Sequence, residues 1–426
     1  MSGATWVRWR IVTMLIVASS ISYILRYNVS TAGPAMIEDL GISEIQFGWV
    51  LAAFTAGYTI FQFPGGVLGI AMGLRRALAL IMVLWGVLTL LTAAVPGTAF
   101  AGAGVTLLAV IAVRFLVGAV NAPFYPLTNA FVERWFPPGH WGMPNGLLST
   151  GLTLGVAGST PILAWMIVEF GWRQSFFVMA PLGFVAAWVC WWYLRDDPSE
   201  HKSVNAAELQ LITADRPAAP RAETGEPGWL RVLKDRNIQL LTLSYFCANY
   251  VFYQMFNWVY YYFVSVRGFD EQQAGFVTSI QWIAAAVGAT LGGFVCDYIT
   301  RKLGLRRGCR WTIMFGIGVA GVFMLIASMP VSETVLVVCL AMAFLFSQLI
   351  EAPFWAAAIG IGGRYTAAAG GIMNTGGNAV GFVNALLVPV TAKYLGWPAA
   401  MATAAMFAFV SAALFMFIRA DERIAD

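Results

Sequence analysis

The stretch VNAPFYP at residues 120–126 has a close counterpart, IEAPFWA, at residues 350–356 of the same chain. Other pairs repeat at nearly the same offset of 225 to 230 residues: NGLLSTG at 145–151 with GGIMNTG at 370–376, and FGW at 170–172 with LGW at 395–397. Internal repeats at one long period indicate two structurally equivalent halves. Parallel repeats built from membrane helices are an architecture of secondary transporters.

Apolar runs recur along the whole chain of 426 residues, of which 59% are hydrophobic and 11% charged, with a mean hydropathy of +0.73. Water-soluble domains of this size do not have such a composition. A helix needs about 20 apolar residues to cross a bilayer. Twelve runs reach about that length: 11–33, 45–68, 77–95, 104–126, 143–168, 175–194, 238–264, 273–299, 311–329, 334–358, 368–391 and 398–418. We therefore predict an all-α membrane protein with twelve transmembrane helices.

Residues 195–236 interrupt this pattern with mixed charge and several prolines. We predict a cytoplasmic linker here, between a six-helix half at 1–194 and a second half at 237–426. Most of the 25 Lys and Arg residues fall in the linker and in loops on the same side of the membrane as the N-terminus. Short cytoplasmic loops carry such an excess of positive charge. We expect a multi-pass protein of the cytoplasmic (inner) membrane with both termini in the cytoplasm. The first run lacks a cleavage site of small residues, so we expect it to be retained.

Several function classes are disfavoured by the sequence. The net charge of +4 follows from the topology, so we do not read it as a nucleic-acid footprint. The five cysteines show no metal or redox spacing, and His140 and His201 both fall in loops. No nucleophile and base pair or phosphate-binding loop stands out. We expect no enzyme activity, no cofactor, no resident metal and no nucleic-acid partner.

Arg26 and Arg114 lie inside apolar runs. A charge at the bilayer centre costs at least ~2.5 to 3.5 kcal/mol, so we expect both side chains to face a polar cavity. By helical spacing Tyr23 shares the face of Arg26, while Asn121 and Tyr125 share the face of Arg114. Two arginines repel each other in a low dielectric unless an anion lies between them, and guanidinium groups bind carboxylates bidentately. The pair predicts an organic-anion site; an arginine reaching to the interface and a structural ion pair remain open.

Six stretches carry a family resemblance: LRYNVS, YTIFQFPGG, RFLVGAVNAPFYP, YFCANYVFYQMFNWVYYYFVSVRGF, GGFVCDYITR and GIMNTGGN. The chain resembles a major facilitator superfamily transporter. Within that superfamily it is similar to the anion:cation symporter family, which includes bacterial hexuronate and galactonate importers and, more distantly, vesicular glutamate transporters and sialin. The resemblance implies two pseudo-symmetric six-helix halves that rock around a central site.

The chain departs from this family at two positions. Relatives usually carry an acid just before the first intramembrane arginine and a glutamate seven residues after the second, and the resemblance implies that these bind the coupling proton. Leu25 and Asn121 stand there, and neither can titrate. Glu351 takes the repeat position of Asn121. Apolar surroundings favour the neutral form of a carboxyl, so Glu351 is a candidate for proton coupling, with a salt bridge to an arginine or a structural hydrogen bond as alternatives.

Further polar side chains lie inside the runs, where each needs a hydrogen-bond partner in the absence of water. We expect substrate contacts from those at family-like positions: Tyr58, Gln62, Tyr253, Asn257, Gln281, Asn374 and Asn378. Helix packing alone could explain the two asparagines at 374 and 378. Tyrosines 260–262 fit either the cavity or an interfacial aromatic belt.

The segment GGFVCDYITR keeps the superfamily's gating pattern, with Asp297 and Arg301 as its charged members. In the equivalent loop of the first half, Ile70 replaces the aspartate. We predict a cytoplasmic gate at Asp297 and Arg301 and a weaker one at the first loop.

The leading hypothesis is secondary transport of a small organic anion, a carboxylate with an apolar or aromatic body, by alternating access. Proton symport through Glu351 competes with facilitated diffusion or anion exchange. An alternative is a facilitator or exchanger of a larger amphipathic solute, such as a siderophore or drug, and another is a non-transporting sensor with the same fold. The partners we expect are the anion, protons and membrane lipids, and we expect a monomer.

Overall fold

The computed structural model is helical throughout the part of the chain that it describes, which contains no strand. The described residues are 4–97, 102–137, 142–213 and 228–424. Contacts divide the chain into two compact units. The first unit comprises Met1–Ala35 and Ala56–Glu223, and the second comprises Met36–Thr55 and Thr224–Asp426. Helix α3 (Glu44–Met72) therefore begins in the second unit and ends in the first.

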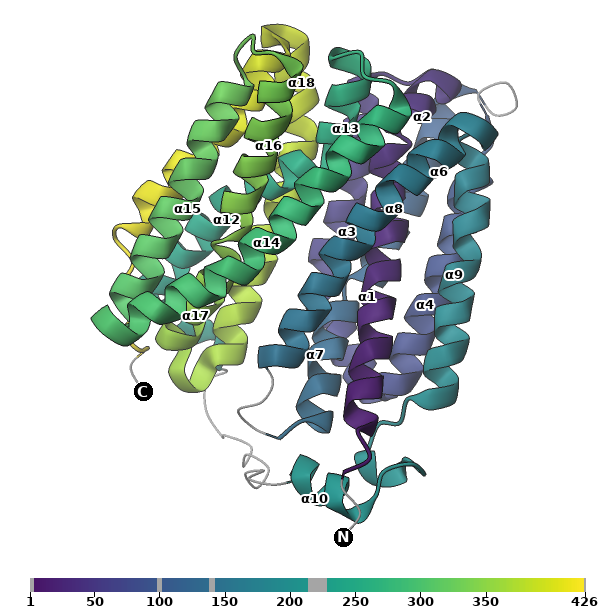
Figure 1. Cartoon of the computed structure of the whole chain (residues 1–426). Helices are drawn as coiled ribbons and strands as arrows, with labels where there is room; N and C mark the ends of the chain where they lie inside the picture. Colours follow the sequence, from purple (N-terminus) through teal and green to yellow (C-terminus); the bar gives the residue numbers. More distant parts are fainter. Residues whose placement is uncertain (1–3, 98–101, 138–141, 214–227, 425–426) are drawn as a thin grey trace. The chain divides into compact units, whose positions relative to one another are not determined.

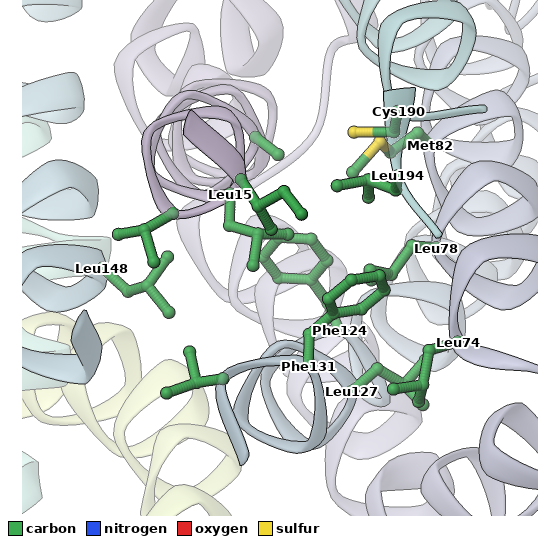
Figure 2. Close-up of a cluster of buried hydrophobic side chains, with 14 of the residues drawn as sticks. Leu15, Leu74, Leu78, Met82, Phe124, Leu127, Phe131, Leu148, Cys190 and Leu194 are labelled. Atoms are coloured by element: carbon green, nitrogen blue, oxygen red, sulfur yellow. The ribbon is translucent and has the colours of Figure 1, made fainter. Parts of the chain in front are cut away.

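The first unit is a bundle in which α1 packs on α8 and α9, and α4 packs on α9 (Figure 1). Its helices, besides the second part of α3, are α1 (Val7–Thr31), α4 (Leu74–Ala93), α6 (Ala103–Asn121), α7 (Phe124–Trp135), α8 (Gly142–Phe170), α9 (Trp172–Tyr193), η1 (Pro198–Glu200) and α10 (Ala206–Thr213). Figure 2 shows Phe124, Leu127 and Phe131 of α7 gathered with Leu74 and Leu78 of α4 in the buried core. Close van der Waals contact of this kind is what holds membrane helices together.

The second unit is a bundle in which α12 packs on α18, and α14, α15 and α16 pack on one another. Its helices are α11 (Gly228–Lys234), α12 (Arg236–Asn257), α13 (Val259–Tyr261), η2 (Tyr262–Val266), α14 (Glu271–Leu303), α15 (Leu305–Ala327), α16 (Glu333–Gln348), α17 (Glu351–Gly362), η3 (Gly363–Tyr365) and α18 (Thr366–Phe415). The short α2 (Gly33–Leu40) crosses the boundary between the units. Gly396, with φ of 84°, interrupts α18 and separates the last two predicted runs.

The prediction of an all-α membrane protein is confirmed. Within the described ranges, nine helices are long and apolar enough to cross a membrane. The predicted runs at 45–68, 238–264 and 368–391 are helical as well, in α3, α12 and the first part of α18.

Three runs are interrupted where a continuous helix was expected. The run at 104–126 divides into α6 and α7 at Pro123, and the run at 334–358 divides into α16 and α17 just before Pro353. Proline lacks an N–H and disfavours helical geometry in the residue before it, so it is tolerated mainly in a first turn. Both breaks fall in the repeated stretches VNAPFYP and IEAPFWA. In the run at 238–264, Trp258 with φ of −122° separates α12 from α13.

Helices α14 and α16 approach closely through two glycines one turn apart. A Cβ built on Gly288 would lie 2.0 Å from the carbonyl oxygen of Leu345, and one on Gly292 would lie 1.9 Å from that of Leu349. The spacing is a small-xxx-small pattern, which lets the backbones of membrane helices meet. No side chain fits at either position without displacing the neighbouring helix.

Replacing Gly292 with alanine is expected to destabilise the second unit by about 1 to 3 kcal/mol, because the added methyl group overpacks the seam. Thermal unfolding of the detergent-solubilised protein measures the loss. Gly293→Ala is the control, since a Cβ there would lie 3.8 Å from its nearest atom, the Cβ of Ala352. Equal stability of the two variants would contradict the close approach.

The beginning of the predicted linker packs within the first unit through Glu208 on α10, which is fully buried. Its carboxylate accepts hydrogen bonds from the backbone N–H groups of Val7 and Arg8, both at 3.1 Å, and from the hydroxyl of Thr5. Figure 1 shows α10 beside the start of α1. The first N–H groups of a helix lack intrahelical partners and favour a negative charge, so Glu208 caps α1.

Glu208→Gln is expected to weaken this attachment. Glutamine replaces one of the two accepting oxygens with an NH₂ group, which would face a hydrogen-bond donor and could not accept from it. Charge-assisted hydrogen bonds contribute about 1.5 to 3 kcal/mol each, so we expect a lower melting temperature and faster trypsin cleavage within the linker. Glu200→Gln, at an exposed position of the same linker, is the matched control. If both variants are cleaved at the wild-type rate, Glu208 does not hold the linker.

His201 packs in the same region against the rings of Tyr193 and Trp135, with centroids 4.8 and 5.8 Å away. Burial and, next, the positive charge of Arg195 lower the pKa of His201. The neutral ring can therefore accept the backbone N–H of Ser203 through Nδ1 at 3.2 Å. His140 lies outside the described residues. No group of three or more metal-ligating side chains occurs within the described ranges.

Candidate functional site

Arg26 lies in the last third of α1 and is 4% exposed. Its guanidinium carbon is 5.2 Å from the ring centre of Tyr23 and 5.3 Å from that of Tyr58 on α3. One guanidinium nitrogen, Nη1, also donates to the hydroxyl of Tyr23 at 3.5 Å. Aromatic faces attract cations without neutralising them. Tyr23, which was predicted beside Arg26, and Tyr58, which was predicted only as a substrate contact, therefore hold the guanidinium in place and leave its formal charge intact.

Arg114 on α6 is 3% exposed, and its charge interacts repulsively with that of Arg26. Both arginines belong to the first unit. Residues 1–37 and 45–132, which include α1, α4, α6 and all of α3 after Glu44, contain no aspartate or glutamate. Two buried like charges in a low-dielectric interior are unfavourable unless opposite charge comes between them. The pair is thus suited to an anionic ligand.

Asn121 joins the helices that carry the two arginines. Its Oδ1 accepts the hydroxyl of Ser22 on α1 at 3.0 Å, and its Nδ2 donates to the carbonyl of Val117 at 2.9 Å. Both polar atoms of the amide are therefore used. Tyr125 on α7 is hydrogen-bonded to Ser149 on α8 at 3.1 Å between hydroxyl oxygens. The structure thus brings Asn121 beside α1, as the predicted site requires, and links Tyr125 to the neighbouring helix.

Two predicted glutamines are buried with an unsatisfied polar atom. Gln62 on α3, in the first unit, is 6% exposed, and Gln281 on α14, in the second, is 1% exposed. Within the described ranges, no hydrogen-bond partner reaches Oε1 of Gln62 or Nε2 of Gln281. Buried polar atoms are nearly always paired with protein, water or a ligand. Each glutamine can therefore offer a hydrogen bond to a bound molecule.

Glu351 begins α17 in the second unit and receives two hydrogen bonds on one oxygen. The hydroxyl of Tyr245 donates to Oε1 at 2.8 Å, and the indole N–H of Trp355 donates to the same atom at 2.9 Å. Among the described side chains and backbone, no hydrogen bond reaches Oε2. A carboxyl held through one oxygen can accept and release a proton on the other without breaking its supports.

The polar face of α12 continues to α18 at Tyr253. Its hydroxyl donates to Oδ1 of Asn378 at 2.9 Å, and Nδ2 of Asn378 donates to Oδ1 of Asn374 at 3.1 Å and to its backbone carbonyl at 2.8 Å. Tyr253 is 1% exposed, whereas both asparagines are only partly buried. The three predicted residues are thus connected as a chain.

Asn257 belongs to a different network, buried between α12 and α18. Its Nδ2 donates to Oδ1 of Asn384 at 3.3 Å, Asn384 donates to Oε1 of Gln254 at 2.9 Å, and Gln254 donates to the sulfur of Met401 at 3.4 Å. Gln254 and Asn384 are fully buried. The structure therefore connects Asn257 to helix packing as well as to the predicted site.

The interfacial-belt interpretation of tyrosines 260–262 is wrong, because none of the three side chains is more than 5% exposed. Tyr261 stacks on Trp397 with ring centres 5.7 Å apart and donates to Glu44 at 2.8 Å. Glu44 belongs to the part of α3 assigned to the second unit. The aromatic residues after α12 are packing residues inside this unit. Their high density in sequence does not distinguish a core from a lipid-facing belt.

Asp297 and Arg301 are both exposed near the end of α14. Arg301 donates through Nε to the backbone carbonyl of Asp297 at 3.3 Å. In the first unit, Ile70 is exposed in the last turn of α3, and the first turn of α4 is capped by Asp196, which accepts the backbone N–H of Arg75 at 2.7 Å. An acid from the linker thus binds the helix that follows the altered motif.

Sequence reasoning missed several neighbours of the predicted site residues, although some of these neighbours carried a signal. Tyr245 lies eight residues before Tyr253 on the same face of α12, so helical spacing could have identified it. Trp355 lies one turn after Glu351 and could have been found in the same way. Asn384 had no such signal, because its partners are set by the packing of α12 on α18.

The sequence matches the family model described as Major Facilitator Superfamily over residues 15–384. The chain is 31% identical to a protein of Cupriavidus necator named as a probable sulfoacetate transporter, over 88% of this chain and 84% of that protein. It is 30% identical to a probable galactarate/D-glucarate transporter of Bacillus subtilis, over 90% and 85%. It is 29% identical to the hexuronate transporter of the same species, over 96% and 94%.

A similar fold occurs in a solved bacterial homolog of the human lysosomal transporter Spinster, in an inward-facing and unoccupied conformation. The TM-score is 0.76 at 14% identity, and the match covers 97% of both chains.

Proposed function

Because the chain belongs to the major facilitator superfamily, we propose that it carries a small organic anion across the cytoplasmic membrane by alternating access. The observation that supports this most directly is the burial of Arg26 and Arg114 in one unit, whose helices α1, α4 and α6 contain no acid. The relatives are named as a probable sulfoacetate transporter, a probable galactarate/D-glucarate transporter and a hexuronate transporter, and all of these compounds are organic acids.

In this proposal the two guanidinium groups clamp the anion by paired hydrogen bonds, and arginine stays charged throughout the cycle. Neutral polar groups complete the contacts: Tyr23, Tyr58, Gln62, Asn121 and Tyr125 in the first unit, and Tyr253, Asn257, Gln281, Asn374 and Asn378 in the second. The unsatisfied atoms of Gln62 and Gln281 support this role. Asn257 contributes less, since its amide is bonded to Asn384.

Glu351 is proposed as the proton carrier, because Leu25 and Asn121 cannot titrate and Glu351 keeps one carboxylate oxygen outside its hydrogen bonds to Tyr245 and Trp355. Exchange of anions without a proton is the competing mechanism. Asp297 and Arg301 are proposed to close the cytoplasmic gate. We further propose that both termini are cytoplasmic, as the distribution of Lys and Arg favours, and that the transporter is a monomer surrounded by lipid.

Uptake by proteoliposomes tests the proposal. Purified protein is expected to take up radiolabelled sulfoacetate, glucarate or glucuronate with saturation, and excess unlabelled acid is expected to compete. A neutral sugar of similar size should not compete. If none of the acids is taken up or raises the melting temperature of the purified protein, the proposed cargo class is wrong.

A further inference from the structure

Two buried cysteines meet where α14 turns into α15, although their spacing in sequence carries no redox signature. Cys296 lies near the end of α14 and Cys309 in the first part of α15. The thiol of Cys309 donates a hydrogen bond to the sulfur of Cys296. We infer that this pair is a modification site: a dithiol that a hydroperoxide oxidises to a disulfide, which clamps the α14–α15 hairpin.

The two backbones approach closely beside the thiols. The chain reverses at Gly304, which has φ of 85°, and the helices meet again at Thr300 and Gly308. A Cβ built on Gly308 would lie 2.0 Å from Oγ1 and 3.0 Å from Cα of Thr300. The sulfur of Cys296 lies 3.9 Å from the same hydroxyl oxygen, and Cys309 is the residue after Gly308. A disulfide requires two Cβ atoms at short distance, so this seam favours a bond between the helices.

Burial of the pair restricts which oxidants can reach it. Cys296 is 3% exposed and Cys309 is fully buried. A bulky oxidant such as glutathione disulfide is therefore excluded from both sulfurs, whereas hydrogen peroxide is a small, neutral molecule. Cys296 accepts the hydrogen bond and retains some exposure, so it is placed to react first.

The oxidation consumes one hydrogen peroxide. The sulfur of Cys296 attacks a peroxide oxygen, the O–O bond breaks, and a sulfenic acid and one water form. The sulfur of Cys309 then attacks the sulfenic sulfur, the S–O bond breaks, and a second water leaves with the remaining thiol proton. The two sulfurs together lose the two electrons that reduce the peroxide. A thiol reductant reverses the reaction by disulfide exchange once local opening exposes the bond.

The disulfide would act on the end of α14 that carries the proposed gate residues. Asp297 follows Cys296 directly, and Arg301 donates to the backbone carbonyl of Asp297. The bond would fix this end of the helix to α15. Disulfides stabilise a fold mainly by restricting the unfolded chain. We therefore expect oxidised wild-type protein to melt at least ~2 °C above the reduced protein, with the difference reversed by dithiothreitol.

Mass spectrometry can show the bond directly, because trypsin separates the two cysteines. Cleavage after lysine and arginine places Cys296 in peptide 268–301 and Cys309 in peptide 308–310. The folded, detergent-solubilised protein is treated with hydrogen peroxide, its remaining thiols are alkylated, and it is then digested. We expect these two peptides to be joined at least ~10-fold more often than peptide 268–301 is joined to the peptides of the other three cysteines. Dithiothreitol should release them.

The peroxide dose is calibrated on Met143, which is 66% exposed. A pair that stays reduced at a dose that converts Met143 to its sulfoxide would overturn the inference. Oxidation of Cys296 to a sulfinic acid without linkage, or equally frequent linkage to the other cysteines, would overturn it as well. Equal melting temperatures of oxidised and reduced wild-type protein would refute the clamp.

Single-cysteine variants are the matched controls. A mixture of Cys296→Ser and Cys309→Ser proteins should give no joined peptides, since a joined pair there would have to form between molecules. Peroxide should leave the melting temperature of Cys309→Ser unchanged. Cys309→Ala replaces this variant if the buried hydroxyl prevents folding. Joined peptides from the mixture at the wild-type level would contradict pairing within one hairpin.

Discussion

Arg114→Ala is expected to lower uptake of the organic anion at least ~100-fold, which corresponds to about 3 kcal/mol of lost binding. Arg114 is buried on α6, and its charge is repelled by that of Arg26. Without it, the proposed anion would lose a bidentate partner, and α6 contains no other cation to replace it. Arg26→Ala is expected to have an effect of the same size. Initial rates of uptake into proteoliposomes, at equal amounts of inserted protein, measure both.

A lysine variant tests the hydrogen-bond geometry of the arginine clamp separately from its charge. Arg114→Lys keeps the positive charge but cannot form two parallel hydrogen bonds, so we expect most of the loss to remain. Arg10→Ala is the matched control, because Arg10 lies on the same helix as Arg26 and is exposed. Wild-type uptake by a folded Arg114→Ala protein would rule out the anion clamp.

Glu351→Gln is expected to abolish accumulation driven by a pH gradient while leaving counterflow exchange intact. One pH unit is worth about 1.4 kcal/mol per proton, so coupling to one proton allows up to ~10-fold accumulation in the wild-type protein. Glutamine cannot bind the proton, but its oxygen can still accept from Tyr245 and Trp355. The accumulation ratio should therefore fall to about one without loss of folded protein.

The matched control is Glu333→Gln, an exposed acid in the first turn of α16 in the same unit. Substrate-driven exchange, measured with no pH gradient, shows whether the variant still cycles. An accumulation ratio that is unchanged in Glu351→Gln would exclude Glu351 as the proton carrier. Loss of exchange together with accumulation would instead assign Glu351 to the transport cycle itself.

The long helices could be predicted from sequence because a bilayer allows few structures. Backbone groups in hydrocarbon must be satisfied within the segment, so an apolar run of sufficient length becomes a helix. The spacing of residues along one helix also predicted that Tyr23 shares a face with Arg26 and that Asn121 shares a face with Arg114. These relations depend only on the geometry of a single α-helix, which is the same in every protein.

Contacts between helices could not be predicted in the same way. Ser22 and Asn121 are 99 positions apart, and their hydrogen bond depends on how α1 meets α6. Glu208 occurs in a charged segment that was predicted only as a linker, yet it is fully buried at the start of α1. The tyrosines after α12 were expected either in the cavity or at the lipid interface, and they are buried in the unit. A high density of aromatic residues is compatible with a lipid interface as much as with a core.

The amide network between α12 and α18 has a mechanical consequence. Sliding one helix along the other by a single residue, about 1.5 Å, would distort the bonds from Asn384 to Asn257 and Gln254, the first of which is already 3.3 Å long. Inside a membrane no water replaces them. The network therefore fixes the axial register of α12 and α18, and the two helices move together. The chain after α12 leaves regular α-helical geometry at Trp258 and passes through α13 into the π-helical turn Tyr262–Val266, so bending between α12 and the residues after it is easiest there.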